Sequence, residues 1–291
     1  MKNKKKLIKI IAIMAAVLLF VSSISAVIAL NFHKIFLKLE QNGVFCKEIK
    51  LVEVSLENTD AVTLEGLKRD GRVTFDQSLM LVNTLYTLQD DFVPEISEYK
   101  STTVYMNDCM LDAYAKLSAD ISEKFNKKLY VSSDFRTAED QQVLYEEDPL
   151  TATLPGASEH QSGLALDVYV ARYAGDGFIK SPVGRFVNRN SWMYGFIIRY
   201  PSHAEDVTGI RFEPWHIRYV GHPHADVIYN NHITLEEYIL GFEIGEWYEI
   251  DGYLVSRQKP TESGELTLPA SFSACVISPD NTGCYIVTVE K

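Results

Sequence analysis

The sequence predicts an α+β fold, a small mixed or antiparallel sheet with flanking helices, because helical and strand patterns follow one another irregularly. Residues 110–125 carry apolar side chains at helical spacing, namely Leu111, Tyr114, Leu117, Ile121 and Phe125. Residues 163–170 alternate as a strand does, and Asp167 lies on the face opposite Leu166 and Val168. No regular strand–helix–strand repeat joins these elements, which favours α+β.

The other elements expected near this helix and this strand are short. Strands are expected at 129–135, 195–199 and 217–220, and a helix near 183–193. Another helix follows Thr137, which is a credible N-cap. Thr234 caps a further helix, and Gly241 ends it. We therefore expect one domain over residues 79–241, preceded by a stalk or linker at 32–78 and followed by a small β-rich extension at 242–291.

The N-terminus predicts export. Five lysines between residues 2 and 9 precede an uncharged run over 10–30, and about 20 helical residues span a bilayer core. The lysine excess places the N-terminus in the cytoplasm. Residues 1–31 are thus expected to be a cytoplasmic tip and a single transmembrane helix in the lipid bilayer, with the rest of the chain outside. A cleaved signal peptide is the alternative, since small residues lie near 22–26.

Net charge and the absence of nucleotide-binding motifs argue against two classes of binding partner. The formal net charge of −11 argues against a nucleic-acid partner, because phosphate backbones are bound by clusters of Lys and Arg. Neither a GxGxxG unit after a strand nor a GxxxxGK[ST] loop occurs, so a nucleotide has no support. Cys275 and Cys284 flank a turn-rich stretch, which makes a hairpin disulfide plausible.

Two histidines and two acids stand out as candidate site residues. Asp167 lies within an apolar strand, where an unpaired carboxylate is costly. His160 precedes that strand, and Glu213 and His216 occur together in EPWH. Two His and one carboxylate are the ligands of many catalytic zinc sites, and a further Glu can serve as general base. Residues three apart share a face in a helix but not in a strand, so the geometry of EPWH stays open.

Five segments then resemble one known family. SEHQSGLALD at 158–167 is similar to the SxHxxGxxxD motif of the VanY-type zinc D-alanyl-D-alanine carboxypeptidases, and EPWHIRYVG at 213–221 to its second half. SSDFRTAEDQ at 132–141, LVNTLYTLQDDFVPEI at 81–96 and YGFIIRYP at 194–201 resemble further family segments in the same order. Asp134 departs from the pattern, since the family often has Gly there.

The resemblance implies a role for each matching residue. The ligands of one Zn²⁺ would be His160, Asp167 and His216. Glu213 would be the catalytic base and acid, and Arg136 would stabilise the carbonyl oxygen or hold the substrate carboxylate. The remaining substrate-binding candidates are Gln141, Ser158, Trp215 and Tyr194, the two aromatics being equally plausible as core residues.

The expected reaction is hydrolysis of the terminal bond of peptidoglycan stem peptides ending in D-Ala-D-Ala. Two alternatives stay open: a zinc endopeptidase or dipeptidase acting on peptidoglycan peptides, and a non-catalytic wall-binding protein of the same fold. A role in glycopeptide resistance also stays open against routine wall trimming.

Overall fold

The computed structural model describes all residues except 1, 45, 150 and 151, and it omits the side chains of 2–12, 29, 30, 33, 36, 37, 40 and 41. The chain divides into two units, Met1–Val44 and Phe45–Lys291.

The first unit consists of two helices, α1 (Lys2–Leu30) and α2 (Phe32–Gln41). Within the described part of the chain, no helix is both long enough and apolar enough to cross a membrane. The predicted anchor includes residues 10–12, 29 and 30, whose side chains lie outside the described residues. The anchor therefore stays a prediction.

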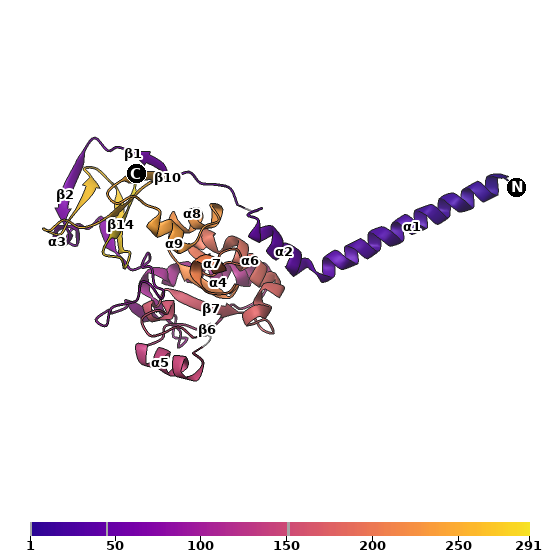
Figure 1. The fold of residues 1–291 in the computed structure, drawn as a ribbon, viewed down its shortest axis with the longest axis horizontal. Helices are drawn as coiled ribbons and strands as arrows, with labels where there is room; N and C mark the ends of the chain where they lie inside the picture. The colour runs from indigo at the N-terminus through magenta and orange to yellow at the C-terminus, as the bar shows by residue number, and fades with distance from the viewer. Residues whose placement is uncertain (1, 45, 150–151) are drawn as a thin grey trace. The chain divides into compact units, whose positions relative to one another are not determined.

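The second unit contains a four-stranded antiparallel sheet in the order β6-β7-β9-β8. Its strands β6 and β7 are labelled in Figure 1. Its strands are β6 (Tyr130–Ser133), β7 (Ala165–Tyr169), β9 (His216–Tyr219) and β8 (Phe196–Ile198). All four coincide with strands expected from the sequence. The fold is α+β with mixed sheets and helices, as predicted.

Two helices contribute side chains to the hydrophobic cluster on the apolar face of this sheet. Leu166, Val168 and Ile217 belong to one buried cluster with side chains of α4 (Leu111–Phe125) and α6 (Pro182–Asn190). Because side chains alternate along a strand, Asp167 and His216 must lie on the other face. The apolar packing on one face thus determines where polar groups can gather on the other.

Short elements complete this part of the unit, and two of them have the predicted caps. Thr137 caps α5 (Ala138–Glu147), and Thr234 caps α9 (Leu235–Leu240) in a capping box with Glu237. The others are β4 (Ile96–Glu98), β5 (Tyr105–Asn107), η1 (Asp108–Met110), η2 (Glu159–Ser162), η3 (Gly175–Lys180), η4 (Ser191–Tyr194), α7 (Glu205–Thr208) and α8 (His224–Asn230).

The predicted stalk at 32–78 differs from the structure over residues 52–75, which are built into sheets with the C-terminal strands. A six-stranded sheet has the order β1-β10-β11-β14-β13-β3, and β12 pairs with β2. The bounds are β1 (Val52–Val54), β2 (Thr59–Thr63), α3 (Leu64–Leu67), β3 (Val73–Phe75), β10 (Trp247–Ile250), β11 (Tyr253–Gln258), β12 (Glu265–Pro269), β13 (Ala274–Pro279) and β14 (Tyr285–Glu290). These pairings give the early segment the partners that a solvated stalk lacks.

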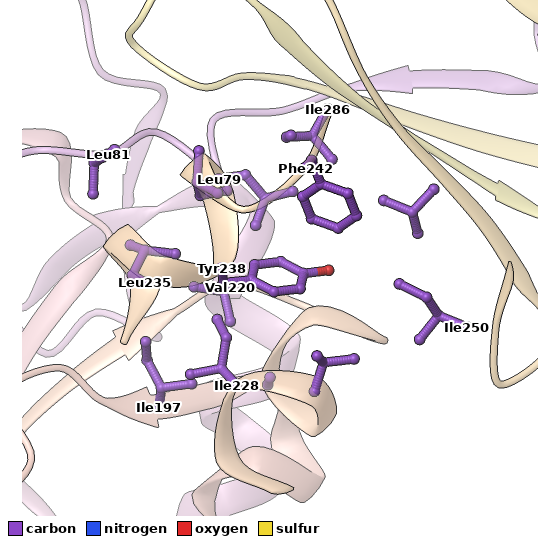
Figure 2. Packing of buried hydrophobic residues seen from close by; sticks show 14 residues of the cluster. Leu79, Leu81, Ile197, Val220, Ile228, Leu235, Tyr238, Phe242, Ile250 and Ile286 are labelled. Atoms are coloured by element: carbon purple, nitrogen blue, oxygen red, sulfur yellow. The ribbon is translucent and has the colours of Figure 1, made fainter. Parts of the chain in front are cut away.

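A buried cluster joins the C-terminal strands to helices α8 and α9. Figure 2 shows Phe242, Ile250 and Ile286 beside Tyr238, Leu235 and Ile228. The buried imidazole of His224 adds polar contacts, with Nδ1 2.7 Å from the Tyr238 hydroxyl and Nε2 3.0 Å from the Thr288 hydroxyl. The β-rich extension is therefore packed against the domain that precedes it.

The hairpin disulfide is not formed. The thiols of Cys275 and Cys284 are free and buried. In the β13–β14 register, Cys275 lies opposite Val289, whereas Cys284 directly precedes β14 at the other end of the hairpin. The two cysteines flank the turn at unequal distances, which places them too far apart along the ladder to be cross-strand partners.

Candidate active site

Asp167 and His216 meet because they are directly paired across neighbouring strands. Asp167 of β7 is the register partner of His216 of β9, and side chains at such positions project from the same face. The Asp167 Oδ1 lies 2.9 Å from the His216 Nδ1. With a nitrogen of His160, these groups supply three ligand atoms that all lie within 4.8 Å of one another.

His160 lies in the η2 turn before β7, and its side chain lies close to Asp167 and His216. Its Nδ1 lies 2.9 Å from the carbonyl oxygen of Asp134, and its Nε2 lies 3.6 Å from the Asp167 Oδ2. The turn ends at Gly163, whose φ of +70° is left-handed. A Cβ there would lie 2.7 Å from the Ile96 Cγ2, so glycine is needed on both counts.

Glu213 joins the group through a turn that the sequence left open. The backbone N–H of His216 donates to the carbonyl of Glu213 at 3.1 Å, which makes EPWH a four-residue turn with Pro214 at its second position. The Glu213 Oε2 consequently lies 4.0 Å from the His216 Nδ1. The turn, rather than a shared helix or strand face, brings the carboxylate and the imidazole together.

The electrostatics separate the roles of the two carboxylates. Burial alone would raise the pKa of Asp167, but the hydrogen bonds from His160 and His216 outweigh it and hold that pKa well below its ordinary value. Burial raises the pKa of Glu213 above its ordinary value. Asp167 is thus a permanent anion suited to a cation, whereas Glu213 is suited to exchanging a proton.

Arg136 borders the same cleft and is held in place by two neighbours. Its Nη1 donates to the Gln141 Oε1 at 2.7 Å, and its Nη2 donates to the Ser133 Oγ at 2.6 Å. Gln141 in turn donates to the carbonyl of Thr153 at 2.7 Å. Gln141 therefore orients the guanidinium, while its predicted contact with substrate stays a prediction. The Asp134 carboxylate accepts a hydrogen bond from the backbone N–H of Tyr105 at 2.6 Å.

The cleft collects all but one of the predicted site residues. A cavity of about 340 Å³ is lined by Arg136, Gln141, Ser158, His160, Asp167, Glu213, Trp215 and His216, among others. Tyr194 is not among the described lining residues. Its hydroxyl donates to the Asp120 Oδ2 at 2.5 Å, and its ring packs against the core beside α4. Its predicted contact with substrate therefore stays a prediction.

A buried ionic network behind the site was missed. Glu159 has no exposed side-chain surface, and its Oε1 accepts from Arg199 at 2.7 Å and from Arg218 at 2.8 Å. A signal was present in the sequence, since FIIRYP and HIRYVG each place one arginine inside an apolar strand. A buried arginine needs an acidic partner. Tyr200 also lines the cleft and was not predicted.

The donor set fits a divalent metal. Two imidazole nitrogens and a carboxylate oxygen are typical ligands of a catalytic zinc ion with an open fourth position. The Nδ1 of His160 is engaged by a backbone carbonyl, which leaves its Nε2 facing Asp167. Such orientation of the second ring nitrogen is characteristic of metal-ligating histidines.

Comparison with known proteins agrees with this geometry. The family model described as VanY, D-alanyl-D-alanine carboxypeptidase, matches residues 103–222. A D-alanyl-D-alanine carboxypeptidase of Enterococcus faecium is 31% identical over 275 residues, which cover 81% of this chain and 87% of the relative.

The chain belongs to the VanY family of D-alanyl-D-alanine carboxypeptidases. It is accordingly a D,D-carboxypeptidase, as the sequence predicted.

Two solved structures of related peptidases are similar to it. One is a glutamate mutant of the D,D-pentapeptidase VanY from a VanB-type vancomycin-resistance cassette in complex with Zn(II), at 31% identity and a TM-score of 0.50, covering 56% of this chain and 98% of that one. The other is the D,D-dipeptidase VanXYg in complex with a phosphinate analogue of D-Ala-D-Ala, at 26% identity and a TM-score of 0.62, covering 80% of this chain and 98% of that one. The first of these proteins thus binds Zn(II), and the second binds an analogue of D-Ala-D-Ala.

Proposed function

We propose that this VanY-family chain uses one zinc ion to remove the terminal D-Ala from peptidoglycan stem peptides. The observation that carries the proposal is the convergence of His160, Asp167 and His216 on one point, with Glu213 beside them in the same cleft. The zinc-bound relative and the analogue-bound relative support the choice of metal and of substrate.

The positions of the site residues suggest a separate role for the metal ligands, for Glu213 and for Arg136 in the proposed hydrolysis. A zinc ion held by the three ligands would polarise the scissile carbonyl and lower the pKa of a water molecule. Glu213 then takes the proton of the attacking water and delivers it to the departing amine of D-Ala. Arg136 faces the same cleft, where its fixed guanidinium can pair with the carbonyl oxygen or the terminal carboxylate.

The shape of the cleft supports a peptide substrate rather than a free dipeptide. A second hollow of about 410 Å³, lined by Leu88, Phe92 and Phe135 among others, shares the wall residue Arg136 with the cleft. A dipeptide would leave this space empty, whereas the upstream residues of a stem peptide can occupy it.

The substrate choice is tested by comparing a pentapeptide ending in D-Ala-D-Ala with free D-Ala-D-Ala under identical conditions. We expect release of one D-Ala per pentapeptide and a kcat/KM at least about tenfold above that for the dipeptide. A preference for the free dipeptide would make the chain a dipeptidase, and the absence of any cleavage would favour a wall-binding role.

We also propose that the enzyme acts outside the cytoplasm from a membrane anchor. The support is the lysine-rich start followed by the uncharged run over residues 10–30. Fractionation of cells that express the full chain tests this proposal: we expect it in the membrane fraction, resistant to alkaline extraction and accessible to external protease in protoplasts. Recovery of the intact chain in the soluble cytoplasmic fraction would refute it, and a shortened soluble form outside the cell would indicate a cleaved signal peptide.

A further inference from the structure

Glu159 occupies a position that its ion pairs with arginine do not fully explain. Both arginines, Arg199 and Arg218, donate to the same oxygen, Oε1. The other oxygen, Oε2, is buried and has no hydrogen-bond partner among the described residues. Half of the carboxylate is therefore left for another group, because a buried acceptor without a partner is costly.

The group that faces this oxygen is the imidazole of His216. Its Nε2 lies 3.6 Å from the Glu159 Oε2. That nitrogen, too, is buried without a hydrogen-bond partner in the described part of the chain. The opposite nitrogen, Nδ1, faces Asp167 at 2.9 Å and Glu213 at 4.0 Å. The ring thus stands between the site on one side and Glu159 on the other.

Glu159 is held rigidly by segments from four parts of the fold. Arg218 donates from Nη2 to the backbone carbonyls of Ser78 at 2.9 Å and Met80 at 2.8 Å. Arg199 also donates to both oxygens of Glu236 in α9, at 2.8 and 2.5 Å. A carboxylate fixed in this way can set the orientation of a neighbouring ring.

We infer that Glu159 is the positioning residue of the metal site, and that its Oε2 accepts a hydrogen bond from the Nε2–H of His216 so that Nδ1 faces the metal. This inference rests on the proposed zinc site and goes beyond it, because it concerns the ring's other nitrogen. When a carboxylate accepts a hydrogen bond from one ring nitrogen of a histidine, it fixes the tautomer of that histidine. It also makes the other nitrogen, which binds the metal, more basic.

An amide cannot replace the carboxylate in this role. A carboxylate offers acceptors at both oxygens, one for the arginines and one for His216, whereas glutamine has a single acceptor oxygen. If that oxygen serves the arginines, the NH₂ group of the glutamine points at the Nε2–H of the ring, donor against donor. Glu159→Gln should therefore disturb His216 even when the fold is kept.

The test compares the zinc affinity of Glu159→Gln with that of Glu236→Gln, measured by competition with a chromophoric chelator. Both variants remove one carboxylate from the network around Arg199, but Glu236 has no contact with His216 among the interactions of the described residues. We expect Glu159→Gln to bind zinc about 10–100-fold more weakly than the wild type. For Glu236→Gln we expect a lower melting temperature with zinc affinity within about threefold of the wild type.

Equal zinc affinity in wild type and Glu159→Gln would overturn the inference, as would an equal loss in both variants, which would indicate general damage to the network. A wild-type protein that binds no zinc would overturn the proposed metal site itself. Glu159→Asp covers the case in which the glutamine variant does not fold, because it keeps the charge but withdraws the carboxylate by one bond. It should also weaken zinc binding while it remains folded.

The zinc-loaded wild type gives an independent signature without any substitution. NMR of histidine labelled with ¹⁵N should show two zinc-bound rings of opposite kind, His160 bound through Nε2 and His216 bound through Nδ1 with a slowly exchanging Nε2–H. Binding of His216 through Nε2, or rapid exchange of its Nε2 proton, would contradict the inference.

Discussion

Replacing Glu213 by glutamine removes the group that exchanges the proton in the proposed reaction and retains the size of the side chain. Glu213 is not one of the three converging ligands, and its nearer oxygen lies 4.0 Å from the His216 Nδ1. The variant should therefore still bind one zinc ion per chain. The defect should lie in the chemical step.

The size of the defect follows from the role of the residue. A positioned general acid–base contributes about 10²–10⁴-fold in rate, and each tenfold corresponds to about 1.36 kcal/mol of activation free energy. We expect kcat for D-Ala release to fall by about 10²–10⁴-fold, with a smaller change in KM. Because burial raises the pKa of Glu213, the wild-type rate should also fall on acidification as this group gains a proton, and that dependence should be absent from the residual activity of the variant.

The assay is D-Ala release from a D-Ala-D-Ala pentapeptide, combined with zinc content determined by elemental analysis. Glu205→Gln is the matched control, since Glu205 is an exposed glutamate on α7, eight residues before the first residue of the EPWH turn. The control should keep wild-type activity. A Glu213→Gln enzyme with wild-type kcat would refute the assignment of the base, and a variant that has lost its zinc would show that Glu213 acts as a ligand instead.

Three further predictions concern other parts of the structure. Arg136→Lys should lower kcat/KM by about 10²-fold, because one ammonium cannot keep the contacts with Gln141 and Ser133 and still present a planar pair of donors to the substrate. Gly163→Ala should cost about 1–3 kcal/mol of unfolding free energy, owing to the left-handed φ and the 2.7 Å approach of a Cβ to Ile96, and a denaturant titration measures this. Burial lowers the pKa of His224 from 6.5 to about 3 in the folded state, so the unfolded state binds the proton first and stability should fall as pH drops from about 6.5 towards 3. Denaturant midpoints across this range should fall less steeply for His224→Gln, and an unchanged slope would contradict the assignment.

Local signals in the sequence were sufficient for most of the catalytic sheet and its helices. Thr137 and Thr234 cap helices where expected, and Asp167 interrupts an apolar strand at the position where the site forms. These features depend on residues close together in the chain. The geometry of Glu213 and His216 was not accessible in the same way, because it depends on a turn rather than on helical or strand periodicity.

Features that depend on distant residues were not predictable from local patterns. Residues 52–75 pair with strands about 200 residues later, and nothing in their own sequence identifies those partners. Tyr194 matched the family pattern at a site segment, yet its hydroxyl binds Asp120 outside the cleft. The partnership of Glu159 with Arg199 and Arg218 likewise arises only when three separate segments meet.

Metal reconstitution is a direct test of whether one zinc ion at this site is needed for activity. The full-length enzyme is treated with a chelator, freed of it, and titrated with Zn²⁺ while D-Ala release from the pentapeptide is measured. The His160, Asp167 and His216 site predicts no release from the metal-free enzyme and a linear recovery that reaches its maximum at one zinc ion per chain. Full activity in verified metal-free enzyme would show that the reaction does not depend on zinc.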